Sequence, residues 1–166
     1  DVRLTLVDDD SPDNRVRKWA REVGVLDRIT LTGRVASAEL VRRYTRATIV
    51  VVPSRYEGFG LPAVEAMACG TPVVASRAGA LAEVMDATGG GLTAPRDDPQ
   101  ALAAAIGRLL DDVEARTLMA KRGRERVLEL YAWPRIAAST AGIYREVVDE
   151  VLRGRPTSTI TSASVG

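Results

Sequence analysis

The sequence contains no histidine, and this absence removes several common kinds of active site. Ser-His-Asp and Cys-His catalysis, metal sites built from imidazoles and proton transfer through a histidine are all excluded for this chain. The single cysteine, Cys69, excludes an internal disulfide and favours a reducing compartment. Any chemistry must therefore rest on carboxylates, arginine, lysine, hydroxyls and backbone amides.

Long apolar runs and a strong charge imbalance are also missing. No segment approaches the length of a membrane span. The net charge of +1 does not indicate a nucleic-acid partner, and the basic cluster at 121–124 lacks the interleaved aromatic residues of such a surface. The chain starts on a strand-like segment without a charged leader, so we do not expect this segment to be a signal peptide, and the missing initiator Met leads us to expect a piece of a longer protein.

The remaining sequence alternates between strand and helix patterns. Short runs rich in valine and isoleucine predict buried parallel strands at 2–7, 29–32, 48–52 and 73–75. Capping residues and helical periodicity predict helices at 12–23, 37–46, 62–69, 100–111, 113–131 and 134–153, with Ser11, Ser37 and Asp98 among the start signals. We therefore expect an α/β fold with a Rossmann-like, doubly wound parallel sheet, followed by C-terminal helices.

Four strands are few for this fold class, so we expect the sheet to be incomplete at its N-terminal edge. A missing strand would leave unpaired backbone groups, and self-association through the exposed edge is expected. The Ser/Thr-rich segment 153–166 is expected to be a disordered tail.

A glycine loop with two carboxylates follows the third predicted strand. Gly58 and Gly60 precede a helix whose first turn contains Pro62. This predicts a helix N-terminus that favours a phosphate, with free N–H groups around Gly60, Leu61 and Ala63. Glu57 and Glu65 flank the turn, and a carboxylate accepts hydrogen bonds from a sugar diol. Gly-x-Gly turns are common, and a glutamate in a first turn stabilises the helix dipole without a ligand. Spacing alone leaves both interpretations open.

The run from Pro53 to Ser76 closely resembles the C-terminal donor-binding domain of retaining glycosyltransferases of family 4, also called glycosyl transferases group 1, which have the two-domain GT-B architecture. The shared signature is Pro-Ser-x-x-Glu-Gly-Phe-Gly-Leu-Pro-x-x-Glu-Ala-Met-Ala-x-Gly-Thr-Pro-Val-Val-Ala-Ser. The resemblance extends over residues 1 to about 150. It implies a donor-binding domain at 1–131 and a C-terminal cross-over helix at 132–152.

The resemblance also implies a nucleoside-diphosphate sugar as donor, retention of anomeric configuration, no metal and no further cofactor. Glu57 would be the catalytic residue that touches hydroxyls of the transferred sugar, and Glu65 would bind the nucleotide ribose. The other implied donor-binding residues act largely through their backbone: Gly58, Phe59, Gly60 and Leu61 on the sugar and diphosphate, and Gly33, Arg34 and Val35 on the base.

One departure and one omission qualify this interpretation. The family's glycine turn after the first strand is replaced by Asp8-Asp9-Asp10. The family's diphosphate-binding arginine and lysine lie upstream of residue 1, and the acceptor (a glycan, lipid or small molecule) binds an N-terminal domain that is missing here. We therefore expect this chain alone to transfer no sugar. We expect a cytoplasmic location. Peripheral association with the inner face of the membrane is the alternative for the full-length enzyme.

Other interpretations stay open. The chain could be a stand-alone nucleotide-sugar binding module or an inactive remnant. An NADP-binding oxidoreductase is suggested by the match of 58–63 to G-x-G-x-x-A and by Arg77, although the glycines follow the strand too late. A receiver domain is suggested by the acidic turn 8–10, which suits Mg²⁺, although no aspartate ends the third strand.

Overall fold

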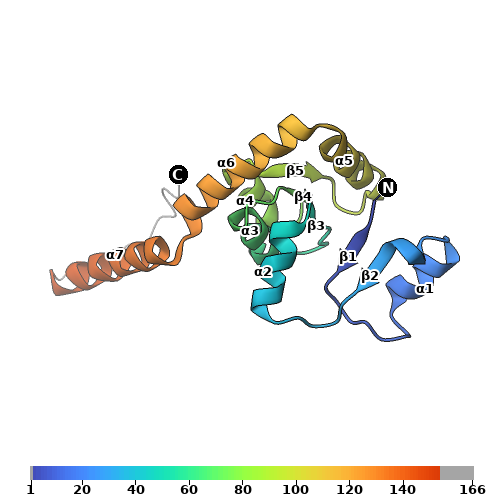
Figure 1. Cartoon of the computed structure of the whole chain (residues 1–166). Helices are drawn as coiled ribbons and strands as arrows, with labels where there is room; N and C mark the ends of the chain where they lie inside the picture. Colours follow the sequence, from blue (N-terminus) through green and yellow to red (C-terminus); the bar gives the residue numbers. More distant parts are fainter. Residues whose placement is uncertain (1, 154–166) are drawn as a thin grey trace. The chain divides into compact units, whose positions relative to one another are not determined.

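The computed structural model describes residues 2–153 of the chain (Figure 1), and these fall into two compact units that divide between Ala47 and Thr48. The sequence predicted no boundary after residue 47. Of the predicted tail, only Arg153 belongs to the described residues.

The first unit is built around two parallel strands. In chain order its elements are β1 (Leu4–Leu6), α1 (Arg15–Glu22), the 3₁₀ helix η1 (Leu26–Arg28), β2 (Ile29–Leu31) and α2 (Ser37–Arg46). Leu4 lies opposite Ile29 in the β1–β2 pair. The two strands are shorter than the predicted segments 2–7 and 29–32.

The two helices of this unit begin differently from the prediction. Asn14, not Ser11, caps α1: its side-chain oxygen accepts hydrogen bonds from the backbone N–H groups of Val16 at 2.8 Å and Arg17 at 3.2 Å. Ala36, not Ser37, occupies the N-cap position of α2, and it provides no side-chain cap. The two serines were therefore wrongly predicted as caps: α2 already begins at Ser37, and it ends at Arg46 as predicted.

The second unit contains a three-stranded parallel sheet in the order β3–β4–β5. Its elements are β3 (Val50–Val52), α3 (Leu61–Ala68), β4 (Val73–Ser76), α4 (Ala80–Thr88), β5 (Gly91–Ala94), α5 (Pro99–Asp111), α6 (Val113–Tyr131) and α7 (Trp133–Leu152). Parallel neighbours need a crossover between them, and α3 and α4 provide the two crossovers. The carboxyl ends of all three strands therefore meet at one edge of the sheet. The predicted α/β class with parallel strands is confirmed.

Two elements of the second unit were not predicted. β5 starts at Gly91 and contains no valine or isoleucine, so it lacks the composition that marked the other strands. α4 begins after Gly79, which offers no side-chain cap. The helices after β5 agree with the prediction closely, because Asp98 caps α5 by accepting from the Ala101 N–H at 2.9 Å and Pro99 sits in its first turn.

The core of the second unit lies between its sheet and the helices α3 to α6. Its largest fully buried side chains include Met67, Leu81, Leu109, Val73 and Val74. The last helix, α7, has no buried residue, and Trp133 and Tyr144 on it are 80% and 69% exposed. Among residues 2–153, no helix has both the length and the apolar character needed to cross a membrane.

Candidate functional site

The predicted glycine loop connects the carboxyl end of β3 to the N-terminus of α3. Gly60 occupies the N-cap position of α3 with φ +96°, a left-handed conformation that side chains other than glycine rarely adopt. A Cβ at this position would also lie 2.8 Å from Cδ1 of Leu81. Both conformation and space thus require glycine at the point where the helix begins.

Backbone amides converge around this helix start. Among residues 2–153, the N–H groups of Gly58, Phe59, Gly60 and Leu61 donate to no backbone carbonyl. The Ala63 N–H, which the sequence predicted to be free, donates to the Gly60 carbonyl at 2.9 Å. The free donors therefore come from the loop and the first helical residue, where the helix dipole adds partial positive charge.

The two predicted carboxylates lie on either side of this start. Glu57 is half-buried in the loop, and its Oε2 lies 3.3 Å from the Ser54 hydroxyl, which donates to it. Glu65 is exposed on α3, about one turn beyond Leu61. The second unit thus brings together all six of its predicted site residues, on one loop and the helix that follows.

Several contacts hold the loop in place at the carboxyl edge of the sheet. The buried hydroxyl of Ser76, at the end of β4, donates to the Ser54 carbonyl. Arg55 forms an ion pair with Asp97 of the β5–α5 connection, with Nε and Oδ1 2.6 Å apart. The loop is therefore attached to the ends of both β4 and β5.

An aromatic contact attaches the same loop to α6. The rings of Phe59 and Tyr131 meet edge to face, with centroids 5.5 Å apart and planes at 88°, a favourable arrangement for aromatic pairs. Partial burial, and secondarily the charge of Glu83, raise the pKa of Tyr131 above its usual value, while Arg126 acts in the opposite direction. The phenol therefore stays protonated over a wider alkaline range.

The β4–α4 connection also contacts the loop, a contact that was not predicted from the sequence. The N–H of Ala80 donates to the Glu57 carbonyl at 3.2 Å, and a Cβ on Gly79 would overlap that same carbonyl oxygen. The available signal was Gly79 itself, a glycine four residues after the end of the predicted strand 73–75. A glycine just beyond a strand end often marks a close approach of two backbones.

The three remaining predicted site residues belong to the first unit, just after β2. Gly33 has φ +64°, and a Cβ there would lie 3.2 to 3.3 Å from the carboxylate atoms of Asp10. Arg34 is exposed and Val35 is half-buried. The β2–α2 connection therefore lies beside the acidic turn that follows β1.

The acidic turn itself is organised by local hydrogen bonds. Asp9 accepts from the backbone N–H of Ser11 at 3.0 Å and from its hydroxyl at 2.7 Å, and these bonds lower the pKa of Asp9. Within residues 2–153, no three acidic or cysteine side chains are grouped closely enough to hold a metal ion. The turn therefore leads into the Asn14 cap without forming the oxygen cluster that the receiver interpretation needs.

Arg77, the residue that the oxidoreductase interpretation needs for a 2′-phosphate, is already paired in this structure. Both terminal nitrogens of Arg77 bind the carboxylate of Asp86, at 3.0 and 2.8 Å, and one of them lies 3.4 Å from the Thr93 hydroxyl. This bidentate pairing occupies the guanidinium that would have bound a 2′-phosphate.

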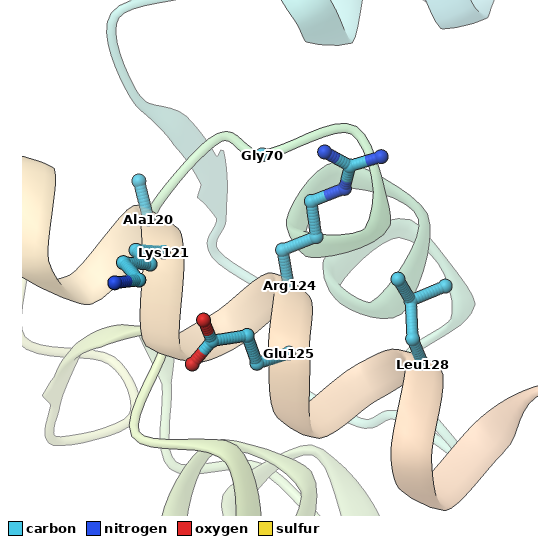
Figure 2. Close-up of a pocket in the computed structure, with 6 residues that line it drawn as sticks. All are labelled: Gly70, Ala120, Lys121, Arg124, Glu125 and Leu128. Carbon is cyan, nitrogen blue, oxygen red and sulfur yellow. The ribbon is translucent and has the colours of Figure 1, made fainter.

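A shallow depression of about 400 Å³ lies elsewhere, where Gly70 faces α6. Figure 2 shows the α6 side chains around this depression. Arg124 is directed toward the Gly70 loop, and Lys121 lies further along α6 next to Ala120. Its lining residues are Gly70, Ala120, Lys121, Arg124, Glu125 and Leu128. None of them belongs to the predicted site, and Gly70 lies past the opposite end of α3 from Gly60.

Comparison with known proteins agrees with this architecture. The chain is 40% identical over 153 residues to the MMP alpha-(1->4)-mannosyltransferase of Mycolicibacterium hassiacum, matching 91% of this chain and 37% of that protein. Sucrose-phosphate synthase from Thermosynechococcus elongatus is 39% identical with a TM-score of 0.80, over 89% of this chain and 39% of that one. HepE from Anabaena, solved with UDP-glucose, has the same fold at 23% identity, with a TM-score of 0.78 over 87% of this chain and 41% of that one.

These likenesses define the class of protein: the chain is the C-terminal half of a GT-B glycosyltransferase fold. The chain belongs to the family glycosyl transferases group 1, whose model matches residues 1–126. It spans about two fifths of the length of the mannosyltransferase and synthase that it matches.

Proposed function

We propose that this chain binds a nucleoside-diphosphate sugar and serves as the donor-binding domain of a retaining glycosyltransferase. The observation that carries the proposal is the set of backbone N–H groups from Gly58 to Leu61, which donate to no backbone carbonyl among residues 2–153. They lie at the N-terminus of α3, where a diphosphate is electrostatically favoured. The UDP-glucose complex of HepE, a protein of the same fold, supports this class of ligand.

The two carboxylates have different parts in this proposal. Exposed Glu65 accepts hydrogen bonds from the two ribose hydroxyls, and half-buried Glu57 accepts from hydroxyls of the transferred sugar. Placing acidic groups on the two sugars, with amides between them, matches a ligand that carries its negative charge in the middle.

The proposed chemistry needs neither a metal ion nor a strong protein base. The amides and the helix dipole stabilise the negative charge that grows on the departing diphosphate, so the bond to the sugar breaks more easily. Glu57 holds the sugar in position while a hydroxyl of the acceptor attacks from the face that the diphosphate leaves, forms the new glycosidic bond and gives its proton to the departing phosphate oxygen. The acceptor site belongs to an N-terminal domain, and we propose that this chain alone transfers no sugar.

The direct test is calorimetric titration of the chain with UDP-, GDP- and ADP-sugars in the presence of EDTA. We expect saturable binding with one nucleotide. Glu65→Gln should weaken both the nucleotide and the nucleotide sugar by about tenfold to a hundredfold, the value of a hydrogen bond to a charged group. Glu57→Gln should weaken only the nucleotide sugar.

Glu125→Gln provides a matched control, because Glu125 is an exposed carboxylate outside the site. It should leave every affinity unchanged. A folded chain that binds none of the nucleotides would contradict the proposal. Release of free sugar or transfer to a simple acceptor by this chain would contradict the proposed dependence on an N-terminal domain.

The same donor-binding residues would also serve a second candidate function, a nucleotide-sugar binding module without transferase activity. Joining an N-terminal glycosyltransferase domain separates the two candidates: transfer in the joined protein supports the transferase, and binding without transfer supports the module.

A further inference from the structure

We infer that Gly79 and Ala80, in the connection between β4 and α4, are positioning residues for Glu57. The inference rests on the proposed function, in which Glu57 contacts the transferred sugar. Gly79 and Ala80 contact the backbone carbonyl of Glu57, so they would act on the ligand only through Glu57.

The contact is a single hydrogen bond at a place where two backbones meet closely. The Ala80 N–H donates to the Glu57 carbonyl at 3.2 Å. Gly79 has φ +52° and ψ −140°, a conformation that is essentially restricted to glycine. Any Cβ on Gly79 would overlap the carbonyl oxygen that Ala80 binds. Glycine at 79 is therefore the condition for the hydrogen bond at 80.

The contact matters because the Glu57 side chain has little else to fix it. The structure gives it one hydrogen bond from its own loop, from Ser54 at 3.3 Å, which is long for two oxygens. The backbone of Glu57 thus determines where the carboxylate lies. A sugar contact requires placement within about half an ångström, so a relaxed backbone weakens it.

The contact also joins the carboxylate to a rigid part of the fold. Ala80 is the first residue of α4, and the next residue, Leu81, is fully buried against the loop at Gly60. The start of α4 therefore supports both the residue that would hold the sugar and the glycine that starts α3. Sugar recognition and the packing of α4 depend on the same short connection.

The test uses Ala80→Pro, which removes the N–H and places the ring Cδ against the Glu57 carbonyl oxygen, so that the Glu57 backbone must shift. Ala80 is the first residue of α4, the position where proline is best tolerated. The measured quantity is the ratio of the affinity for UDP-glucose to that for UDP, or for the pair that the wild type prefers. We expect Ala80→Pro to lower this ratio by about tenfold and to leave the affinity for the bare nucleotide unchanged.

Three comparisons make the result specific. Gly79→Ala should lower the same ratio, whereas Gly24→Ala should not, because Gly24 also has a positive φ (+74°) but no atom within 4 Å of a Cβ. In a Glu57→Gln background, Ala80→Pro should change the affinity for UDP-glucose by less than about twofold, since the two changes act on one interaction.

Each outcome decides between the possibilities. An unchanged ratio in Ala80→Pro, or equal weakening of nucleotide and nucleotide sugar, would overturn the positioning role and leave the proposed function intact. Full additivity with Glu57→Gln would do the same. A folded wild-type chain that binds no nucleotide would overturn the proposed function and this inference together.

Discussion

Gly123, in the middle of α6, lies directly against Gly90, the residue before β5. A Cβ on Gly123 would lie 2.7 Å from the Gly90 Cα and 3.2 Å from Cγ of Met67. Gly123 is buried, although basic residues flank it in the sequence. The absence of two side chains lets α6 approach the sheet at this point.

This contact predicts opposite effects for two substitutions of glycine by alanine in helices. Alanine is intrinsically favoured over glycine by about 1 kcal/mol within a helix, so Gly107→Ala in α5, where a Cβ meets nothing within 4 Å, should stabilise the chain by about 0.5–1 kcal/mol. Gly123→Ala should destabilise it by about 1–3 kcal/mol, because overpacking outweighs the gain in propensity. Urea unfolding measures both. Stabilisation by Gly123→Ala would contradict the close approach.

The cap of α1 predicts a second difference. Asn14→Ala removes the side chain that accepts from two helix N–H groups and should lower the free energy of unfolding by about 1 kcal/mol. Ser37→Ala in α2 should change it by less than about 0.5 kcal/mol, because Ser37 is not the N-cap residue. Fluorescence of Trp19, within α1, follows the unfolding of this helix once Trp133 is replaced by phenylalanine. Equal losses in both variants would contradict the assignment of the caps.

Tyr131 predicts a loss of stability at high pH. Its pKa is raised in the folded chain, so the folded state keeps the phenolic proton more tightly than the unfolded state. The associated stability is complete below the ordinary tyrosine pKa of about 10 and is lost as the pH rises through the folded-state value. Tyr131→Phe should reduce this alkaline loss and retain the ring contact with Phe59. Tyr144→Phe, on exposed α7, should keep the wild-type profile when urea unfolding is repeated from about pH 8 to about pH 11.

The pairing of Arg77 with Asp86 predicts that Arg77 has no part in binding. Both groups are largely exposed, and such pairs contribute about 0–1 kcal/mol. Arg77→Ala should therefore change stability little and leave the affinity for a nucleotide sugar as it was. The oxidoreductase interpretation requires the reverse, namely NADPH binding that this variant abolishes. Titration of both proteins with NADPH and with UDP-glucose distinguishes the two.

Sequence patterns predicted those parts of the fold that local signals determine. A run of valine, as at 50–52, indicates a buried strand. Asp98-Pro99 predicted the start of α5, and in the structure Asp98 is the N-cap residue of that helix. β5 was missed because its place is set by pairing with β4, Val73 opposite Gly91, and not by its own composition. Tertiary pairing of this kind leaves little trace in a short segment.

In the candidate site, too, local sequence signals predicted some contacts, and contacts between distant parts of the chain were missed. The motif around Glu57 and Glu65 was identified from the sequence because its residues are close together in the chain. Gly79 and Ala80 meet Glu57 across 22 and 23 positions of sequence, and nothing in a single sequence links them. The Ala63 N–H was predicted free because a tightened first turn, with its bond to Gly60, cannot be recognised from residue types.

The exposure of helix α7 predicts how fast its backbone amides exchange with solvent compared with those of the sheet. Twenty residues without a buried side chain gain little from packing, and packing supplies most of the stability of a helix in a protein. Its amide hydrogens should exchange with solvent deuterium through local fraying, orders of magnitude faster than those of β4, all four of whose residues are buried. The slowest-exchanging amides therefore mark the sheet beneath the glycine loop, and the fastest of the helical ones mark α7.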